Sequence, residues 1–163
     1  LNIAALLHDV GKIGVYDSSL RKTTRLSNEE ILQLKEHPTI GAGIIKRIDF
    51  FHDIAPIVRS HHERFDGHGY PDGLANDAIP IESRIICVAD AYDAITSKRT
   101  YNKPLSPLKA VEEIERNSGT QFDPEVVSAL RNALEPNDLP TVQLNEDDFE
   151  EFEIPNECDP DYL

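Results

Sequence analysis

The apolar residues of the first 134 positions recur every three or four residues, and this spacing constrains the fold more than any other feature of the sequence. Such a period lines one face of an α-helix with apolar side chains, whereas a half-buried strand needs strict alternation. No window of more than four residues alternates cleanly, and no internal repeat occurs. The sequence therefore predicts an all-α fold, a bundle of helices.

Local start signals place the individual helices. Ser27 to Glu30 form a capping box, in which each end residue binds the backbone amide of the other, so a helix should run from there to about Glu36. Prolines in first turns and polar caps give further starts. The remaining predicted helical segments are 1–10, 38–47, a stretch through 57–62, 80–98, 106–117 and 123–134. Between them, residues 64–80 hold three glycines and Pro71, which predict a loop.

Charge divides the chain into two parts. Residues 135–163 contain eleven acidic residues and four prolines but no lysine or arginine, which predicts a disordered acidic tail that can be deleted without loss of stability. Four side chains of the tail could dock a partner or a basic patch, namely Phe149, Phe152, Ile154 and Tyr162. The first 134 residues hold 19 acidic and 16 basic residues, so the folded part is nearly balanced. The net charge of −14 argues against general nucleic-acid binding.

The lengths of the apolar runs and the number of cysteines bear on the compartment and on metal binding. No run approaches the roughly 20 apolar residues that a membrane helix needs, and the first residues lack the basic region of a signal peptide. Cys87 and Cys158 provide neither a disulfide framework nor a thiolate metal site. We expect a soluble, cytoplasmic protein. A chain of this length can form its core without structural metal, so a bound metal would be functional.

Histidines and acids beside apolar segments are the candidate chemistry. His8 and Asp9 end an apolar run. Metal ions would offset the cost of desolvating these two side chains, and the carboxylate could bridge two ions. The alternative is a simple hydrogen bond between His8 and Asp9. His61 and His62 point about 100° apart on a helix, so both serve one site only near a helix end, and otherwise they form an exposed pair. Asp90, inside an apolar helix, needs a metal or a salt-bridge partner.

Two other histidines, His52 and His68, have no supporting context and are expected to be structural or exposed to solvent.

Several short motifs follow one another along residues 1–128. The first are HDVGKIG from His8, HP at 37–38 followed by Gly41, and HHERFDGHGYPDGL from His61. The later ones are IP at 79–80, SRII at 83–86, VADAYDA from Val88, TSKRTYNK at 96–103 and FDP at 122–124. This ordered series resembles the HD-GYP subgroup of the HD metal-dependent phosphohydrolase superfamily. Members of that family are all-helical bacterial phosphodiesterases of cyclic di-GMP, often attached to receiver or sensor domains.

The resemblance implies a ligand set and a metal. The ligands would be His8, Asp9, His37, His61, His62 and Asp90, with Asp9 bridging two ions. Nitrogen and oxygen ligands without thiolate suit iron or manganese. Two ions, or three in some members, would bind a phosphoryl oxygen and acidify a water for attack on phosphorus.

The resemblance also implies roles around the metals. Asp9 and Lys12 would be the catalytic residues, with Lys12 contacting a phosphate or protonating the leaving oxygen. Lys12 shares a face with His8 if the helix continues, but the glycines at 11 and 14 favour a helix end before it. Substrate would also contact Tyr70, and Arg99 and Lys103 would converge on a second phosphate unless they form an ordinary surface helix end.

The loop at 66–73 is the signature of the family. It is expected to form a pocket wall and to contact other signalling proteins, including receiver or sensor domains. Asp66 and Asp93 are expected to orient ligating histidines from outside the ligand set.

The family pattern begins with an upstream helix that supplies a further histidine and, in some members, a glutamate, whereas this sequence begins seven residues before His8. We expect residues 1–134 to be an N-terminally incomplete HD-GYP catalytic domain and residues 135–163 to be the acidic tail. Such a domain would hold one ion tightly and hydrolyse cyclic di-GMP poorly.

The predicted function is hydrolysis of the cyclic dinucleotide cyclic di-GMP by a metal-dependent phosphodiesterase. Two alternatives are a catalytically impaired HD-GYP module that binds signalling partners, and an HD phosphohydrolase that acts on nucleotide monoesters.

Overall fold

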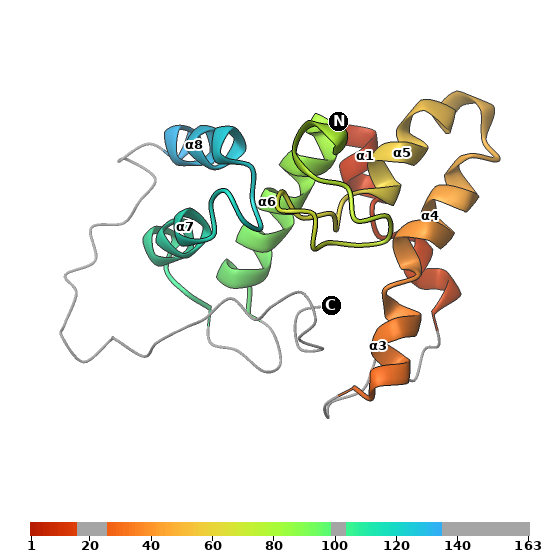
Figure 1. The fold of residues 1–163 in the computed structure, drawn as a ribbon, viewed down its shortest axis with the longest axis horizontal. Coiled ribbons are helices and arrows are strands. Elements are labelled where there is room, and N and C mark those ends of the chain that lie inside the picture. Colours follow the sequence, from red (N-terminus) through yellow and green to blue (C-terminus); the bar gives the residue numbers. More distant parts are fainter. Residues whose placement is uncertain (16–25, 99–103, 135–163) are drawn as a thin grey trace.

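A computed structural model of the chain describes residues 1–15, 26–98 and 104–134 (Figure 1). Every regular element in these ranges is a helix, and the β structure there is limited to an isolated bridge between Ser118 and Phe122. The predicted all-α fold is confirmed. Arg99, Lys103 and the acidic tail lie outside the described residues, so their predicted roles stay predictions.

The helices are short, apart from one in the middle of the chain. In chain order they are α1 (Asn2–Leu7), the 3-10 helix η1 (Val10–Gly14), α3 (Asn28–Leu34), α4 (His37–Ile45), the 3-10 helix η2 (Asp49–Ile54), α5 (Ala55–Arg59), the 3-10 helix η3 (Asn76–Ala78), α6 (Ile81–Thr96), α7 (Pro107–Arg116) and α8 (Pro124–Ala133). None of these helices combines the length and apolarity that crossing a membrane requires.

Side-chain caps begin three of the helices where the sequence predicted them. At the start of α3, the Ser27 hydroxyl accepts a hydrogen bond from the Glu30 amide, and the Glu30 carboxylate accepts one from the Ser27 amide. Ser106 caps α7 and Asp123 caps α8 in the same sense. Each cap satisfies an amide that would otherwise have no partner within the helix.

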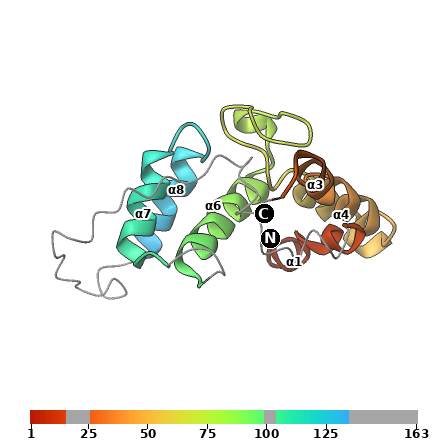
Figure 2. The ribbon, with the colours of Figure 1, turned by 90° about the horizontal axis from the view of Figure 1, so that it is seen from below.

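Within the described ranges, buried apolar side chains form two clusters. The first joins α4 and α5 through Ala42, Ile45, Ala55 and Val58, and Leu7 at the end of α1 packs against it. The second joins α6, α7 and α8, with the fully buried Ile114 and Phe122 among its members. Figure 2 shows α1, α3 and α4 on one side of α6, and α7 and α8 on its other side.

The loop after α5 ties the two halves together. The Phe65 amide donates to the Gln121 carbonyl at 3.1 Å, and the Asp66 amide donates to the Thr120 carbonyl at 2.9 Å. The Ser83 hydroxyl of α6 donates to the Ile57 carbonyl of α5 at 2.9 Å. The segment that carries His61 and His62 is therefore anchored to both halves of the domain.

Two predicted boundaries need adjustment. The predicted helical stretch through 57–62 ends at Arg59, because Ser60 leaves the helical conformation, so His61 and His62 lie in the turn beyond α5. α1 ends at Leu7 and a separate 3-10 helix follows, so Lys12 does not share a helical face with His8. The glycines at 11 and 14, which favoured a helix end before Lys12, predicted this boundary better than a continued helix did.

Candidate metal centre

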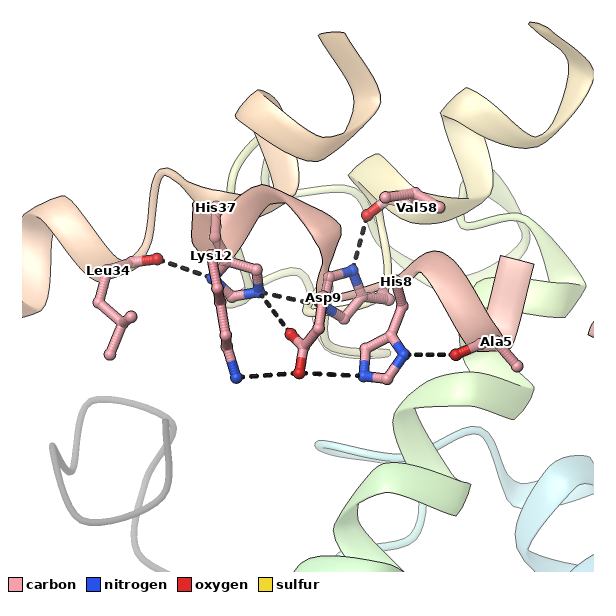
Figure 3. Close-up of polar contacts among 8 residues, drawn as sticks. Ala5, His8, Asp9, Lys12, Leu34, His37 and Val58 are labelled. Atoms are coloured by element: carbon pink, nitrogen blue, oxygen red, sulfur yellow. Dashed lines mark hydrogen bonds and ion pairs between the residues drawn. The ribbon is translucent and has the colours of Figure 1, made fainter. Parts of the chain in front are cut away.

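Five side chains from three segments meet at one place. His37, His61 and His62 form one group and His8, Asp9 and His61 form another, and within each group the potential ligand atoms all lie within 4.8 Å of one another. His8 and Asp9 follow α1, His37 opens α4, and His61 and His62 follow α5. Figure 3 shows Asp9 between His8, Lys12 and His37. The two groups share His61, so they form one continuous site.

Backbone carbonyls fix the orientation of three of these rings (Figure 3). The Nδ1 atoms of His8, His37 and His61 lie 2.6, 2.7 and 2.6 Å from the carbonyl oxygens of the residues three positions earlier, which are Ala5, Leu34 and Val58. A carbonyl only accepts, so each Nδ1 carries the hydrogen and each neutral ring keeps its lone pair on Nε2. All three histidines therefore present Nε2 as the ligating atom.

The Nε2 atoms of His37 and His61 face each other at 3.2 Å. Because both rings already donate through Nδ1, neither neutral ring has a hydrogen to place between the two Nε2 atoms. Both side chains are almost completely buried, so water cannot relieve the contact freely. A cation among these nitrogens would resolve the conflict, and imidazole nitrogen is a common ligand of divalent transition metals. The residues present fit a metal ion.

Asp9 presents its two carboxylate oxygens to different partners. Oδ1 lies 3.4 Å from Nε2 of His37, whereas Oδ2 lies 3.5 Å from Nε2 of His8 and 3.0 Å from the Lys12 ammonium. Partial burial opposes ionisation of Asp9, but the positive charge and the hydrogen bond of Lys12 favour it, and the pKa of Asp9 is lowered. A carboxylate that spans two groups in this way is suited to bridge two ions.

Burial holds the central histidines in their neutral, ligating form. Desolvation lowers the pKa of His37 to about 4 and that of His61 to about 3, in both cases more strongly than the carbonyl hydrogen bond raises it. The pKa of His62 is also well below its ordinary value, chiefly through burial. Metal binding requires deprotonated imidazole, so the site needs little proton release near neutral pH.

A close backbone contact sets the spacing between the segments. A Cβ atom on Gly11 would lie 1.9 Å from the His37 carbonyl oxygen and 2.5 Å from the Gly41 amide nitrogen. Only glycine allows η1 to approach the first turn of α4 this closely. The contact brings Asp9 and Lys12 to His37.

Asp90 is the one predicted ligand that lies in neither group. It is half-buried on α6, and α6 passes beside α1 in both ribbon views (Figures 1 and 2). Its predicted role as a ligand stays a prediction.

Asp66 and Asp93 have hydrogen-bond partners outside the two ligand groups, and their predicted roles in orienting the histidines stay predictions. Asp66 accepts two hydrogen bonds from the Arg64 guanidinium, at 2.7 and 3.0 Å, and these bonds lower its pKa to about 2. The Asp93 carboxylate accepts a hydrogen bond from Ser97. In the described residues, the Nδ1 atoms of His37 and His61 are bound by the backbone carbonyls of Leu34 and Val58.

The other predicted positions lie as follows. Tyr70 stacks on His62 with ring centroids 5.0 Å apart, and the Lys35 ammonium lies 4.8 Å from the centre of the Tyr70 ring. Tyr70 therefore brings the loop against His62, and the predicted roles of the loop as a pocket wall and of Tyr70 as a substrate contact stay predictions. His52 and His68 are exposed, also as predicted.

Sequence reasoning missed the function of Glu63. Glu63 is 2% exposed, and its carboxylate accepts hydrogen bonds from the amides of Asp72 in the signature loop and of Leu74 just after it. The available signal was its charge immediately after two histidines, in a segment expected to face a pocket.

The fold and the site define an all-helical domain with a candidate His/Asp metal centre. Residues 1–126 match the HD domain family, and the chain belongs to this family. Together with the HD and GYP motifs, the curated relatives confirm the resemblance to the HD-GYP type.

Similar proteins include enzymes of cyclic dinucleotide metabolism. The chain is 42% identical over 132 residues to the cyclic di-GMP phosphodiesterase response regulator RpfG of Xanthomonas campestris, and 45% identical over 132 residues to a cyclic di-GMP phosphodiesterase of Thermotoga maritima. These matches cover 80% of this chain but only 35% and 36% of the relatives. The chain thus spans about a third of the length of these relatives.

A solved structure supports the fold. The crystal structure of V-cGAP3, a cyclic GMP-AMP specific phosphodiesterase of Vibrio cholerae, matches with a TM-score of 0.63 at 21% identity, over 84% of this chain and 38% of that one.

Proposed function

We propose that this domain is a metal-dependent phosphodiesterase that hydrolyses cyclic di-GMP in the cytoplasm. The observation that carries the proposal is the contact between His37 and His61, whose Nε2 atoms face each other at 3.2 Å while both Nδ1 atoms are engaged. This arrangement fits a cation, and relatives at 42% and 45% identity are cyclic di-GMP phosphodiesterases.

We infer that the ligands are the six residues predicted from the sequence. His37, His61 and His62 would hold one ion, and His8 with Asp9 would hold a second, with the Asp9 carboxylate bridging the two. Asp90 of α6 would complete the second position. Iron or manganese fits this nitrogen and oxygen donor set best. Bound divalent ions supply positive charge to the phosphate oxygens and acidify water near neutral pH.

Asp9 and Lys12 would act on the substrate side of the site. The Lys12 ammonium is half-buried and held 3.0 Å from Oδ2 of Asp9, so its position is fixed before substrate binds. It would contact a phosphate oxygen or give a proton to the ribose oxygen that leaves phosphorus. The ion pair with Asp9 would keep the ammonium at this position.

The rest of the substrate would contact the signature loop and a basic segment. Tyr70 would line the pocket beside His62, and Arg99 and Lys103 would bind the second phosphate. The loop at 66–73 would contact receiver or sensor domains of the longer signalling proteins in which such domains occur.

A second substrate is favoured by other relatives. The chain is 38% identical over 134 residues to the 3'3'-cGAMP-specific phosphodiesterase 3 of Vibrio cholerae, of which it covers 29%. Cyclic di-GMP and 3'3'-cGAMP share the cyclic diester ring and differ in one base, so the metal centre alone does not discriminate between them.

The deciding experiment compares three substrates. Protein purified without oxygen and loaded with Fe²⁺ or Mn²⁺ is incubated with cyclic di-GMP, 3'3'-cGAMP or GMP, and the products are separated by chromatography. We expect a linear dinucleotide or mononucleotides from a cyclic substrate and no phosphate release from GMP. Phosphate release from GMP alone would favour the monoester alternative. Metal binding without any turnover would favour the impaired module.

Matched variants make the result specific to the site. Asp9→Asn should abolish turnover, because the amide cannot present two anionic oxygens to two ions. His52→Ala removes an exposed histidine elsewhere and should keep the activity of the unmodified domain.

A further inference from the structure

Glu63 follows the histidine pair directly but turns away from the metal groups. The residue is 2% exposed, and its Oε1 accepts a hydrogen bond from the Asp72 amide at 2.7 Å while Oε2 accepts one from the Leu74 amide at 3.0 Å. A buried carboxylate that binds two backbone amides fixes the segment that carries them, because its removal leaves both amides without a partner. Glu63 therefore holds the second half of the signature loop.

The loop that Glu63 holds lies directly on the backbone of the histidine pair. A Cβ atom on Gly69 would lie 2.2 Å from the Arg64 amide nitrogen and 2.6 Å from the His62 carbonyl oxygen. The next residue, Tyr70, donates its amide to the same His62 carbonyl at 3.2 Å. The loop is thus folded back onto the residues from which it starts, and this return brings the Tyr70 ring to His62.

His62 is held differently from the other histidines of the site. His8, His37 and His61 each donate Nδ1 to a backbone carbonyl, whereas within the described ranges the His62 ring has only ring contacts. Tyr70 covers one face at 5.0 Å with an interplanar angle of 22°. A side chain without a directing hydrogen bond keeps one rotamer only as long as its packing excludes the others. The orientation of His62 therefore depends on Tyr70.

We propose that Glu63 is a positioning residue for the metal centre. By binding the Asp72 and Leu74 amides it keeps Tyr70 stacked on His62, and the stack keeps the imidazole aimed at His37 and His61. The inference rests on the proposed role of His62 as a ligand. It predicts that loss of Glu63 weakens metal binding although Glu63 itself touches no metal, because a ligand that is correctly oriented part of the time binds in proportion to that fraction.

The test uses Mn²⁺ affinity and the NMR signal of the His62 ring. Glu63→Ala should weaken Mn²⁺ binding at least tenfold and broaden or shift the His62 ring signal in metal-free protein. Glu63→Gln keeps one acceptor oxygen and should recover part of the affinity. Glu113→Ala is the matched control, since Glu113 on α7 is also a buried acidic residue, 4% exposed, but its carboxylate binds Arg116 and Asn117 at the end of that helix. It should leave both readouts as they are in the unmodified domain.

Two further variants decide the matter if Glu63→Ala does not fold. Tyr70→Ala removes the stack and should reproduce the loss of affinity, whereas Tyr70→Phe keeps the ring and should retain it. Equal affinities for Tyr70→Ala and Tyr70→Phe, or a folded Glu63→Ala protein with unchanged affinity and His62 signal, would overturn the proposal. Absence of cyclic dinucleotide hydrolysis in the unmodified domain would reject the proposed function alone, because the NMR comparison in metal-free protein does not depend on turnover.

Discussion

His37 and His61 share a contact that neither neutral ring can satisfy, with Nε2 facing Nε2 at 3.2 Å and each Nδ1 bound to a carbonyl. His37 lies at the start of α4, and His61, 24 residues later, lies just after the end of α5. Burial keeps both rings neutral. The Nε2 lone pairs of both rings therefore face each other with no hydrogen between them. A proton or a metal ion would stabilise this arrangement, and the two compete for it.

The first prediction concerns acid stability of the metal-free domain. Because the folded pKa is about 4 for His37 and about 3 for His61, the unfolded chain binds more protons between about pH 4 and the ordinary value of 6.5. Stability should therefore be complete above pH 6.5 and fall as the pH drops, by about 1.4 kcal/mol per pH unit for each histidine. Urea unfolding in EDTA at pH 7, 6 and 5 measures this slope. A free energy of unfolding that does not change over this range would contradict it.

The second prediction concerns stabilisation by metal. An ion that binds only the folded domain should raise the free energy of unfolding by about 2.7 kcal/mol at a free concentration 100 times the dissociation constant. Thermal melts with Mn²⁺ and with EDTA should therefore differ in the unmodified domain. The difference should vanish in His61→Ala, since His61 belongs to both ligand groups. It should persist in His52→Ala, and an unaltered response of His61→Ala would argue against the shared site.

The sequence predicted those parts of the fold that depend on local patterns. The capping box from Ser27 to Glu30 and the caps at Ser106 and Asp123 appear as expected, because each is completed within a few residues. The meeting of the site histidines depended on the family resemblance. Spacing along the chain alone does not bring His8 to His61.

Contacts through the backbone or across a loop were not predictable. Carbonyls of Leu34 and Val58 orient the rings, and a carbonyl has no signature in the sequence. Glu63 pairs with amides nine and eleven residues later, which requires the path of the loop to be known. The hydrogen bond between Asp66 and Arg64, two positions earlier, was likewise not predicted from the sequence.

The third prediction concerns the pair of Asp9 and Lys12. Burial opposes the charged form of Asp9, and Lys12 is the strongest influence that lowers its pKa. Lys12→Met should therefore raise the pKa of Asp9, measured by carbon NMR of the carboxyl group in metal-free protein. Turnover of a cyclic dinucleotide should also fall by about 10²-fold or more if Lys12 protonates the leaving oxygen. Lys46→Met, at an exposed position after α4, should change neither quantity.

The last prediction concerns the close approach of η1 and α4. A methyl group on Gly11 would lie 1.9 Å from the His37 carbonyl oxygen, which is backbone and cannot move aside without displacing the start of α4. Gly11→Ala should therefore destabilise the domain by about 1–3 kcal/mol or more, as expected for overpacking, and should also weaken Mn²⁺ binding, because Asp9 and His37 move apart.

Gly43 on α4 provides the control, because a methyl group added there would meet nothing within 4 Å. Gly43→Ala should instead stabilise the helix by about 0.5–1 kcal/mol and leave metal affinity as it was. Urea unfolding in EDTA and Mn²⁺ titration of both variants measure the two effects. Equal stability and affinity of the two variants would show that the spacing between Asp9 and His37 does not depend on this contact.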